Sequence, residues 1–449
     1  MGTKAIRRAV CRGGICRRLF NLLRMTLGYW LRRRFGVRAY NRSVLYKTEP
    51  PYILIPNHVG FWDPFMVAVH TPHPIRYVVA DSNFRNRVLG LLLNLIRAIP
   101  KTKGMRDLES IRRMMDAREQ KNVICLFAEG RRTWDGKSLP LIYSTTKLIK
   151  LLKIPVIVPI LDGMFFANPC WSPSIRPGPV TIRYTKVFEG PELRSMSTDD
   201  IYHQLSGILN HDDYESQRKR MGRYRSRKRA EHLEAVLYTC PACEAIGTLY
   251  SQRHTLRCTS CGYTVRVDRY GFFEGVNGPA PFSTTVEWNE WQIRRLDERI
   301  GTAMTKGPET LLFNDTGVKL SIGFRGARVH AVGFGRASCY LDRVEFLCRR
   351  PNRSLELGHG RLADLDCVET EHGLLFVMPI SELSGWEVHT HERFEYFHRG
   401  VLYQFGRPDD RFSGFKWFST INMLRGRDAQ AAHVERTQPS DLSLMRRLP

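Results

Sequence analysis

Between residues 50 and 190, short apolar runs alternate with longer segments of helical periodicity, and this alternation constrains the fold more than any other feature. The expected strands are residues 52–56, 76–80, 123–128, 156–160 and 181–187, and the expected helices are residues 64–70, 86–97, 107–119 and 143–153. Such alternation predicts an α/β fold, a mixed sheet covered by helices. Catalytic groups are then expected on the loops at the strand ends.

The chain is strongly basic, with 69 Lys and Arg against 44 Asp and Glu and a formal net charge of +25. This excess implies a polyanionic partner: phospholipid head groups, nucleic acid, or both. Residues 15–31 place apolar side chains at intervals of three and four between arginines, and the first 48 residues contain no acidic residue. We interpret residues 1–35 as a basic amphipathic segment on an anionic membrane surface. The alternative is a helix that packs the same stripe onto the protein.

No run of 18 or more apolar residues occurs, so a membrane-spanning helix is not expected. The longest candidate, residues 88–96, is far too short. Arginines interrupt the N-terminal apolar stretch, which argues against a secretory signal. We therefore expect a peripheral or monotopic protein at the cytoplasmic face of a membrane.

The first motif with chemical content is YILIPNHVGFWDPF, residues 52–65. An apolar strand leads to His58 in a turn, and Asp63-Pro64 opens the next helix. The chain folds back over four residues, which can bring the Asp63 carboxylate beside the His58 ring. A carboxylate on one ring nitrogen fixes the tautomer and leaves the other nitrogen as a general base. For an isolated H-x4-D the simpler alternative is favoured, in which Asp63 only caps a helix.

The second motif is VICLFAEGRRTWDG, residues 123–136, in which an apolar strand ends in Glu129-Gly130. Arg131 and Arg132 follow at once, and two guanidiniums beside backbone N–H groups suit a phosphate monoester. Gly130 permits a close backbone approach or a positive φ. Taken alone this motif is weak, because pairs of surface arginines are usually just solvated.

Together the two motifs resemble the glycerolipid acyltransferase family typified by 1-acylglycerol-3-phosphate acyltransferase. That family has an NHxxxxD block, a basic second block, an FPEGTRS block and a proline-containing strand. The chain has all four in this order, at residues 57–63, 98–104, 127–133 and 154–159. The resemblance covers about residues 35–210 and says nothing of the remainder.

The resemblance implies transfer of a fatty acyl chain from acyl-CoA or acyl carrier protein to a lysophospholipid hydroxyl, with 1-acylglycerol-3-phosphate as the first choice. It implies that His58 is the general base and Asp63 its partner. The acceptor site that it implies consists of Lys101, Lys103, Glu129, Gly130, Arg131 and Arg132. Ala128 replaces the usual proline and Arg131 the usual threonine. These departures leave the chemistry intact but keep the identity of the acceptor open.

Two cysteine pairs, CPAC and CTSC, are separated by fourteen residues. This spacing predicts a tetrahedral four-thiolate zinc site, and the segment resembles a zinc ribbon. The ligands are Cys240, Cys243, Cys258 and Cys261. Four thiolates fill the coordination sphere of Zn²⁺, so we expect a structural role. The other cysteines lack ligand spacing, and their pattern favours a reducing compartment over a disulfide framework.

Short β-rich runs follow the cysteine pairs, at residues 310–313, 318–322, 339–346, 374–377 and 394–405, with an amphipathic stretch at 413–424. They predict a small barrel or sandwich capped by a helix, loosely similar to pleckstrin-homology-like modules. The expected organisation is a membrane-surface segment (1–35), an acyltransferase domain (36–211), an exposed or loosely helical basic linker (212–236), a zinc ribbon (237–275), a β-rich domain (276–425) and a disordered polar tail (426–449).

The main alternative function is nucleic-acid binding, because a zinc ribbon beside the basic run at residues 218–229 suits contacts to a phosphate backbone. That alternative leaves the motifs around His58 and Arg132 without a purpose, so we do not expect nucleic acid as a partner. An acyltransferase-like scaffold without activity is a third reading, and the intact His58, Asp63 and Arg132 argue against it.

Overall fold

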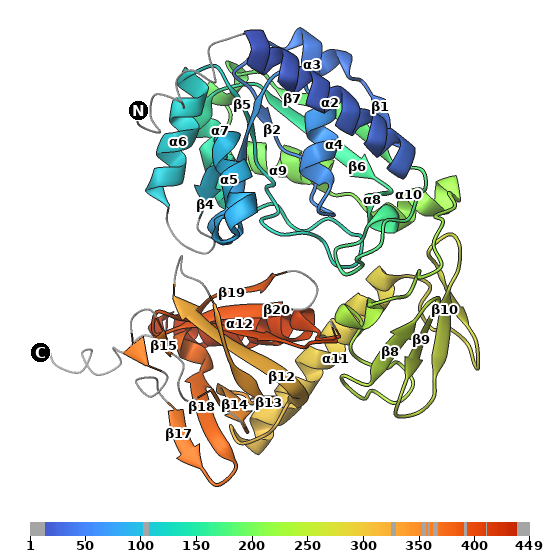
Figure 1. The fold of residues 1–449 in the computed structure, drawn as a ribbon, viewed down its shortest axis with the longest axis vertical. Coiled ribbons are helices and arrows are strands. Elements are labelled where there is room, and N and C mark those ends of the chain that lie inside the picture. Colours follow the sequence, from blue (N-terminus) through green and yellow to red (C-terminus); the bar gives the residue numbers. More distant parts are fainter. Residues whose placement is uncertain are drawn as a thin grey trace, which may run out of the picture. The chain divides into compact units, whose positions relative to one another are not determined.

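The computed structural model describes residues 14–101, 107–324, 329–349, 351–352, 356–357, 360–361, 367–389, 393–409 and 411–437. The chain divides into two compact units (Figure 1). The first comprises Met1–Glu231, Gln252–Thr255 and Val265–Val286, and the second His232–Ser251, Leu256–Thr264 and Glu287–Pro449. The residues of the predicted ribbon, 237–275, are divided between the two units.

The first unit is built on a seven-stranded sheet with the order β1-β7-β6-β2-β5-β3-β4. Strands β2 to β6 run parallel to one another, whereas β7 is antiparallel to β6 and β1 is parallel to β7. The predicted mixed sheet is thus confirmed, and the carboxyl ends of β2 to β6 meet at one edge. The strands are β1 (Arg38–Tyr40), β2 (Ile53–Leu54), β3 (Ile75–Ala80), β4 (Ile99–Lys101), β5 (Val123–Cys125), β6 (Val156–Asp162) and β7 (Thr181–Phe188).

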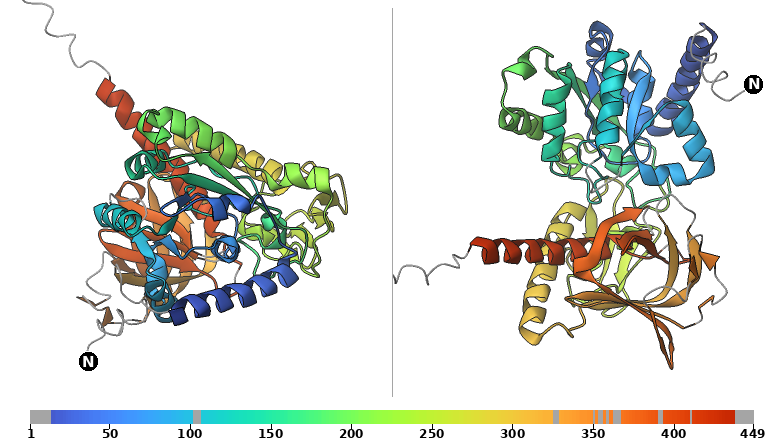
Figure 2. Two further views of the ribbon diagram at one scale, coloured as in Figure 1. Left: turned by 90° about the horizontal axis from the view of Figure 1, so that it is seen from above. Right: turned by 90° about the vertical axis from the view of Figure 1, so that its left-hand side faces the viewer.

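Helices lie on both sides of this sheet (Figure 2). Apolar side chains of α6, α7 and α9, such as Met114, Ile149 and Leu205, form a buried core with Ile53 and Ile124 of the central strands. The helices are α2 (Gly14–Phe35), α3 (Ser43–Lys47), α4 (Asp63–His70), α5 (Arg87–Leu95), α6 (Leu108–Glu119), α7 (Tyr143–Leu152), α8 (Met164–Ala167), α9 (Thr198–Leu209) and α10 (Asp213–Arg220), with 3₁₀ turns η1 (Asp81–Arg85) and η2 (Glu192–Arg194). The four helices predicted between residues 64 and 153 are all present, within two residues at each end.

The second half of α2 packs its apolar stripe onto the protein. Leu31 and Phe35 are buried, and Leu27 is half-buried. The Trp30 ring lies 5.0 Å from that of Trp62, the residue before α4. Met25 and Tyr29 on the same helix are exposed, to 68% and 64%, so one face of α2 packs on the protein and the membrane-surface interpretation of the segment stays a prediction. In the described part of the chain, no helix is both long and apolar enough to cross a bilayer.

The predicted basic linker is an ordered part of the fold. After α10, Tyr224 and Ala230 are buried, and the guanidinium of Arg229 donates from Nε to the carbonyl of Val267 at 3.0 Å. Arg220 pairs with Asp162. The other basic side chains of the run are exposed, so the run keeps a basic surface beside these fixed residues: Arg218, Lys219, Arg223, Arg225, Arg227 and Lys228.

A four-stranded antiparallel sheet follows, with the order β11-β10-β9-β8. Its strands are β8 (Leu249–Gln252), β9 (Thr255–Cys258), β10 (Thr264–Val267) and β11 (Phe273–Gly275). The four predicted zinc ligands lie before β8 and around the end of β9, in the turns of two hairpin-like segments.

Helix α11 (Thr285–Lys306) was not predicted. Its buried face includes Asn289 and Gln292 among the apolar Trp288, Leu296 and Ile300, so apolar periodicity is interrupted. Gln292 accepts the N–H of Tyr238 at 2.9 Å and donates to the carbonyl of Val236 at 2.8 Å. Gln292 is satisfied by backbone groups distant in sequence and also donates to Oδ1 of Asn289, which a local pattern does not reveal.

The second unit contains an eight-stranded antiparallel sheet with the order β17-β18-β14-β13-β12-β21-β20-β19, so the predicted β-rich domain is confirmed. Helix α12 runs over Gly414–Thr437. The prediction of a disordered tail from residue 426 was therefore wrong up to Thr437, and residues 438–449 lie outside the described part. The strands are β12 (Phe313–Phe324), β13 (His330–Cys339), β14 (Arg343–Cys348), β17 (Cys367–Thr370), β18 (Gly373–Pro379), β19 (Leu383–His389), β20 (Arg393–His398) and β21 (Val401–Gly406), with a separate hairpin of β15 (Glu356–Leu357) and β16 (Gly360–Arg361).

Candidate functional site

The turn after β2 is folded around the carboxylate of Asp63. Oδ2 of Asp63 accepts the backbone N–H groups of Val59 at 2.6 Å and Gly60 at 2.8 Å, and it lies 2.9 Å from Nδ1 of His58. A carboxylate only accepts hydrogen bonds, so Nδ1 of His58 carries the proton and Nε2 is the basic nitrogen. Asp63 is the first residue of α4, and the helix has no side-chain cap bond. The alternative role for Asp63 as a helix cap was therefore wrong.

The two residues differ in exposure. Asp63 is fully buried, whereas the side chain of His58 keeps 20% of its surface exposed. The His58 ring lies on Phe127, with the two centroids 4.1 Å apart. The histidine is thus fixed on one side by the carboxylate and on its face by the aromatic ring, yet a substrate can still reach it.

Glu129 joins the two sequence motifs. Its Oε1 accepts the backbone N–H of His58 at 2.8 Å, and its Oε2 accepts that of Leu139 at 2.7 Å. In return, the carbonyl of His58 accepts the backbone N–H of Thr133 at 2.9 Å. Burial raises the pKa of Glu129 to about 8, although the two N–H donors oppose this shift. Both carboxylate oxygens of this buried residue are used to hold the backbone.

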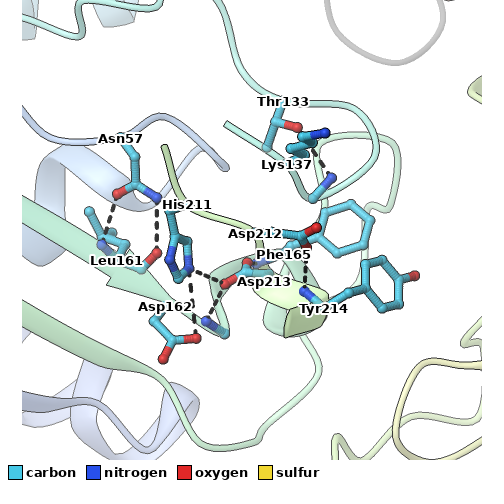
Figure 3. A network of polar contacts seen from close by, with 12 residues as sticks. Asn57, Thr133, Lys137, Leu161, Asp162, Phe165, His211, Asp212, Asp213 and Tyr214 are labelled. Carbon is cyan, nitrogen blue, oxygen red and sulfur yellow. Dashed lines mark hydrogen bonds and ion pairs between the residues drawn. The ribbon is translucent and has the colours of Figure 1, made fainter. Parts of the chain in front are cut away.

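Asn57 fixes the same turn to the end of β6. Its side-chain amide donates to the carbonyl of Leu161 at 3.0 Å and accepts the N–H of Leu161 at 2.8 Å, as Figure 3 shows. Asn57 is buried, and the two contacts link positions 104 apart in the chain. The residue before the histidine therefore behaves as a clamp between neighbouring strands.

A second polar network lies at the end of β6 (Figure 3). The buried Asp213 accepts the backbone N–H of Gly163 at 2.6 Å and of Phe165 at 2.8 Å, and it lies 3.0 Å from Nε2 of His211. Asp162 forms a bidentate ion pair with Arg220, with N–O distances of 3.0 and 3.2 Å. Sequence reasoning did not find this network, and no spacing rule distinguishes its residues.

Asp162, His211 and Asp213 could group around a metal ion, but their existing partners argue against one. Burial lowers the pKa of His211, but the neighbouring carboxylates of Asp213 and Asp162 outweigh it and raise the pKa overall. The His211 ring and the Arg220 guanidinium therefore already occupy oxygens of the two carboxylates. We interpret the network as a structural support for the loop after β6.

The predicted phosphate-binding residues that the structure describes lie at the ends of β4 and β5 or directly after them. Gly130 has φ of +71°, a conformation that favours glycine, and a Cβ there would displace the end of the Ile142 side chain. Arg131 and Arg132 follow in the turn after β5 and are half-buried. Within the described residues, the Arg132 guanidinium has no hydrogen bond or ion pair. Lys101 ends β4, and Lys103 lies outside the described residues.

The four cysteines of the predicted zinc site converge. Their Sγ atoms all lie within 4.8 Å of one another, and the Cys240–Cys261 and Cys243–Cys258 pairs are each 3.7 Å apart. Four thiolates at Zn–S distances of about 2.3 Å have sulfurs about 3.8 Å apart in a tetrahedron. Gly262 has φ of +79°, as the predicted turn requires. The donor set and its spacing thus fit a metal ion, and the distances are too long for disulfides.

Comparison with known proteins finds a family model that matches part of the first unit. Residues 36–161 match the family model described as Acyltransferase, in the region where the motif resemblance was found. The comparison with curated proteins returned no match. Among solved structures, the chain is similar to the crystal structure of the 1-acyl-sn-glycerophosphate (LPA) acyltransferase PlsC from Thermotoga maritima. The identity is 13% and the TM-score 0.39, over 46% of this chain and 83% of that chain.

Proposed function

We propose that this chain, whose residues 36–161 form an acyltransferase-family domain, moves a fatty acyl group from a thioester donor to the hydroxyl of a lysophospholipid. The preferred acceptor is 1-acylglycerol-3-phosphate, which gives phosphatidic acid, and the donor is acyl-CoA or acyl carrier protein. The observation that carries the proposal is the 2.9 Å contact between His58 Nδ1 and Asp63 Oδ2, at the sheet edge where Arg132 also lies.

The chemistry follows from the tautomer that Asp63 fixes. Nε2 of His58 takes the proton of the acceptor hydroxyl, and the hydroxyl oxygen attacks the thioester carbonyl carbon. The C–S bond then breaks, the new ester is released, and the thiolate leaves and receives the proton from the imidazolium. Asp63 stabilises the imidazolium between these steps. The reaction requires that the acceptor hydroxyl be held between His58 and the thioester carbonyl, and it does not require a covalent acyl-enzyme.

The basic residues supply charge for the acceptor's phosphate. Two cations, Arg131 and Arg132, lie on the segment after β5, and Arg132 is the proposed clamp. Lys101 ends β4, and Lys103 follows it in the sequence. Glu129 receives a different role from the one that the resemblance implied. Because both of its oxygens accept backbone N–H groups, we assign it to positioning His58 instead of contacting the acceptor.

The four-thiolate cluster is proposed to hold a structural Zn²⁺. The β-rich unit is proposed to be pleckstrin-homology-like, because β12 pairs with β13 on one side and β21 on the other, and α12 follows the last strand. The enzyme works peripherally at the cytoplasmic face of an anionic membrane. Its net charge of +25 and the amphiphilic acceptor support this location.

Product identification tests the proposal directly. Purified protein is incubated with a panel of lysophospholipids and with acyl-CoA or acyl carrier protein donors, and products are identified by mass spectrometry. Formation of a diacyl phospholipid, fastest with a phosphate monoester acceptor, is the expected result. Absence of any acylated lipid across the panel would refute the proposal.

Replacing Arg132 with alanine is expected to raise the KM for a lysophosphatidate acceptor by about 10- to 100-fold, because a charge-assisted contact contributes about 1.5–3 kcal/mol. An uncharged monoacylglycerol acceptor should show no such change. Steady-state kinetics with both acceptors measures the difference, and Arg112→Ala, on the exposed side of α6, is the control. Equal kinetics for the variant and the parent protein would show that Arg132 does not bind the phosphate.

The Glu129→Gln variant separates positioning from binding. The amide has one acceptor oxygen, so it leaves the N–H of His58 or Leu139 opposed by an NH₂ group, at a cost of about 1–3 kcal/mol. We expect kcat to fall about tenfold or more while the acceptor KM stays within about twofold. Glu109→Gln, at an exposed position, is the control. A raised KM with unchanged kcat would instead support direct contact with the acceptor.

A further inference from the structure

Helix α5 exposes an unusually apolar face. Val88, Leu91, Leu92, Leu95 and Ile96 are exposed to 71%, 71%, 54%, 66% and 46%. Their spacing of three and four places them on one side of the helix. The opposite side carries Gly90 and Leu93, which are buried against the rest of the unit. Five large apolar side chains on one exposed face indicate a surface that meets an apolar environment.

The inward side of α5 is firmly fixed. Asn86 caps the helix by accepting the N–H groups of Val88 and Leu89, each at 3.1 Å. A Cβ on Gly90 would lie 2.7 Å from the carbonyl of Phe84, so the helix approaches the preceding turn closely. The helix cannot rotate to bury the exposed face without breaking these contacts. The apolar face is therefore a lasting feature of the fold.

The charges around this face are positive. The helix contains no acidic residue, and exposed arginines bracket the stripe, Arg87 at its first position and Arg97 just beyond its end. This arrangement matches a helix that lies in a bilayer interface, where leucines enter the acyl boundary and arginines contact phosphates. A purely protein partner would not require cations at both ends of the stripe.

The position of α5 relates it to the proposed catalytic site. The helix follows η1, which follows the carboxyl end of β3. Strand β3 pairs in parallel with β5, whose carboxyl end leads to Arg132. The first turn of α5 therefore begins at the edge of the sheet where His58 and Arg132 lie.

We propose that α5 is the membrane-docking element of the first unit, and that it inserts Val88, Leu91, Leu92, Leu95 and Ile96 into an anionic lipid bilayer with Arg87 and Arg97 on the head groups. This inference rests on the proposed function in one respect, since a lipid acceptor explains why the docking face adjoins the catalytic edge.

Vesicle co-sedimentation of the full chain tests the inference. The Leu91→Glu/Leu95→Glu variant is compared with the parent protein on phosphatidylcholine vesicles with and without phosphatidylglycerol. We expect the parent to bind the anionic vesicles preferentially, and the variant to partition about tenfold less or worse. The matched control is Leu151→Glu/Ile208→Glu, which makes the same change at exposed apolar positions of α7 and α9 and should bind like the parent.

The outcomes distinguish docking from catalysis. Turnover of a short-chain acceptor below its micelle concentration should be the same for the parent and the α5 variant, which also shows that the variant is folded. If the α5 variant loses vesicle binding and neither protein shows measurable turnover, the docking inference is supported and the proposed function is refuted. Unchanged vesicle binding by the variant would overturn the docking inference. The inference would also be overturned if the parent protein did not bind vesicles. The same holds if sedimentation velocity showed that the α5 substitutions only dissociate a dimer.

Discussion

The His58→Ala variant is expected to lose acyl transfer, with kcat lowered by about 10²–10⁴-fold, the range of general-base catalysis. The contact of Nδ1 with Asp63 leaves Nε2 as the base, and alanine removes both the base and the imidazolium that Asp63 stabilises. The acceptor KM should change little, because the phosphate contacts lie on other residues. Thioester-dependent turnover by the purified variant measures the effect.

His203→Ala is the matched control, because that histidine is exposed on α9 and far in sequence from the catalytic turn. The control should keep full activity. Circular dichroism and thermal melting show whether the His58 variant is folded. A folded variant with near-normal turnover would remove His58 from the mechanism and with it the proposed role of Asp63.

The Cys258→Ser variant is expected to lose its metal and to melt at a temperature lower by about 10 °C or more. A structural zinc ion contributes on the order of 10 kcal/mol to the folding of small domains, and about 1 kcal/mol shifts the melting temperature of a unit of this size by about 2–4 °C. Metal analysis and calorimetry measure the two changes. The parent protein should contain near-stoichiometric zinc when prepared under reducing conditions.

Cys367→Ser is the control, since Cys367 lies in β17 and outside the four-cysteine cluster. It should retain zinc and melt close to the parent. A zinc-free parent with the same melting temperature as the Cys258 variant would contradict the metal site. Because four thiolates leave no open coordination position, the metal is expected to act on stability and not on the chemical step.

Local sequence patterns determined the features that depend on nearby residues. Strand and helix periodicity located the sheet of the first unit. A strand end followed by Asp63-Pro64 predicted the pairing with His58, because five residues of chain suffice to form it. The cysteine spacing predicted the thiolate cluster for the same reason, since each knuckle is closed by a tight turn.

Tertiary structure decided the features that depend on which strands become neighbours. Glu129 reaches His58 across 71 positions and Asn57 reaches Leu161 across 104, and both contacts exist only because β2 lies between β5 and β6. Tertiary structure also decided which apolar helix faces are exposed. Apolar stripes on α2 and α5 look alike in the sequence, but α4 lies against α2, whereas the outer face of α5 stays open. A one-dimensional pattern specifies which face of a helix is apolar, and only the folded chain determines what that face meets.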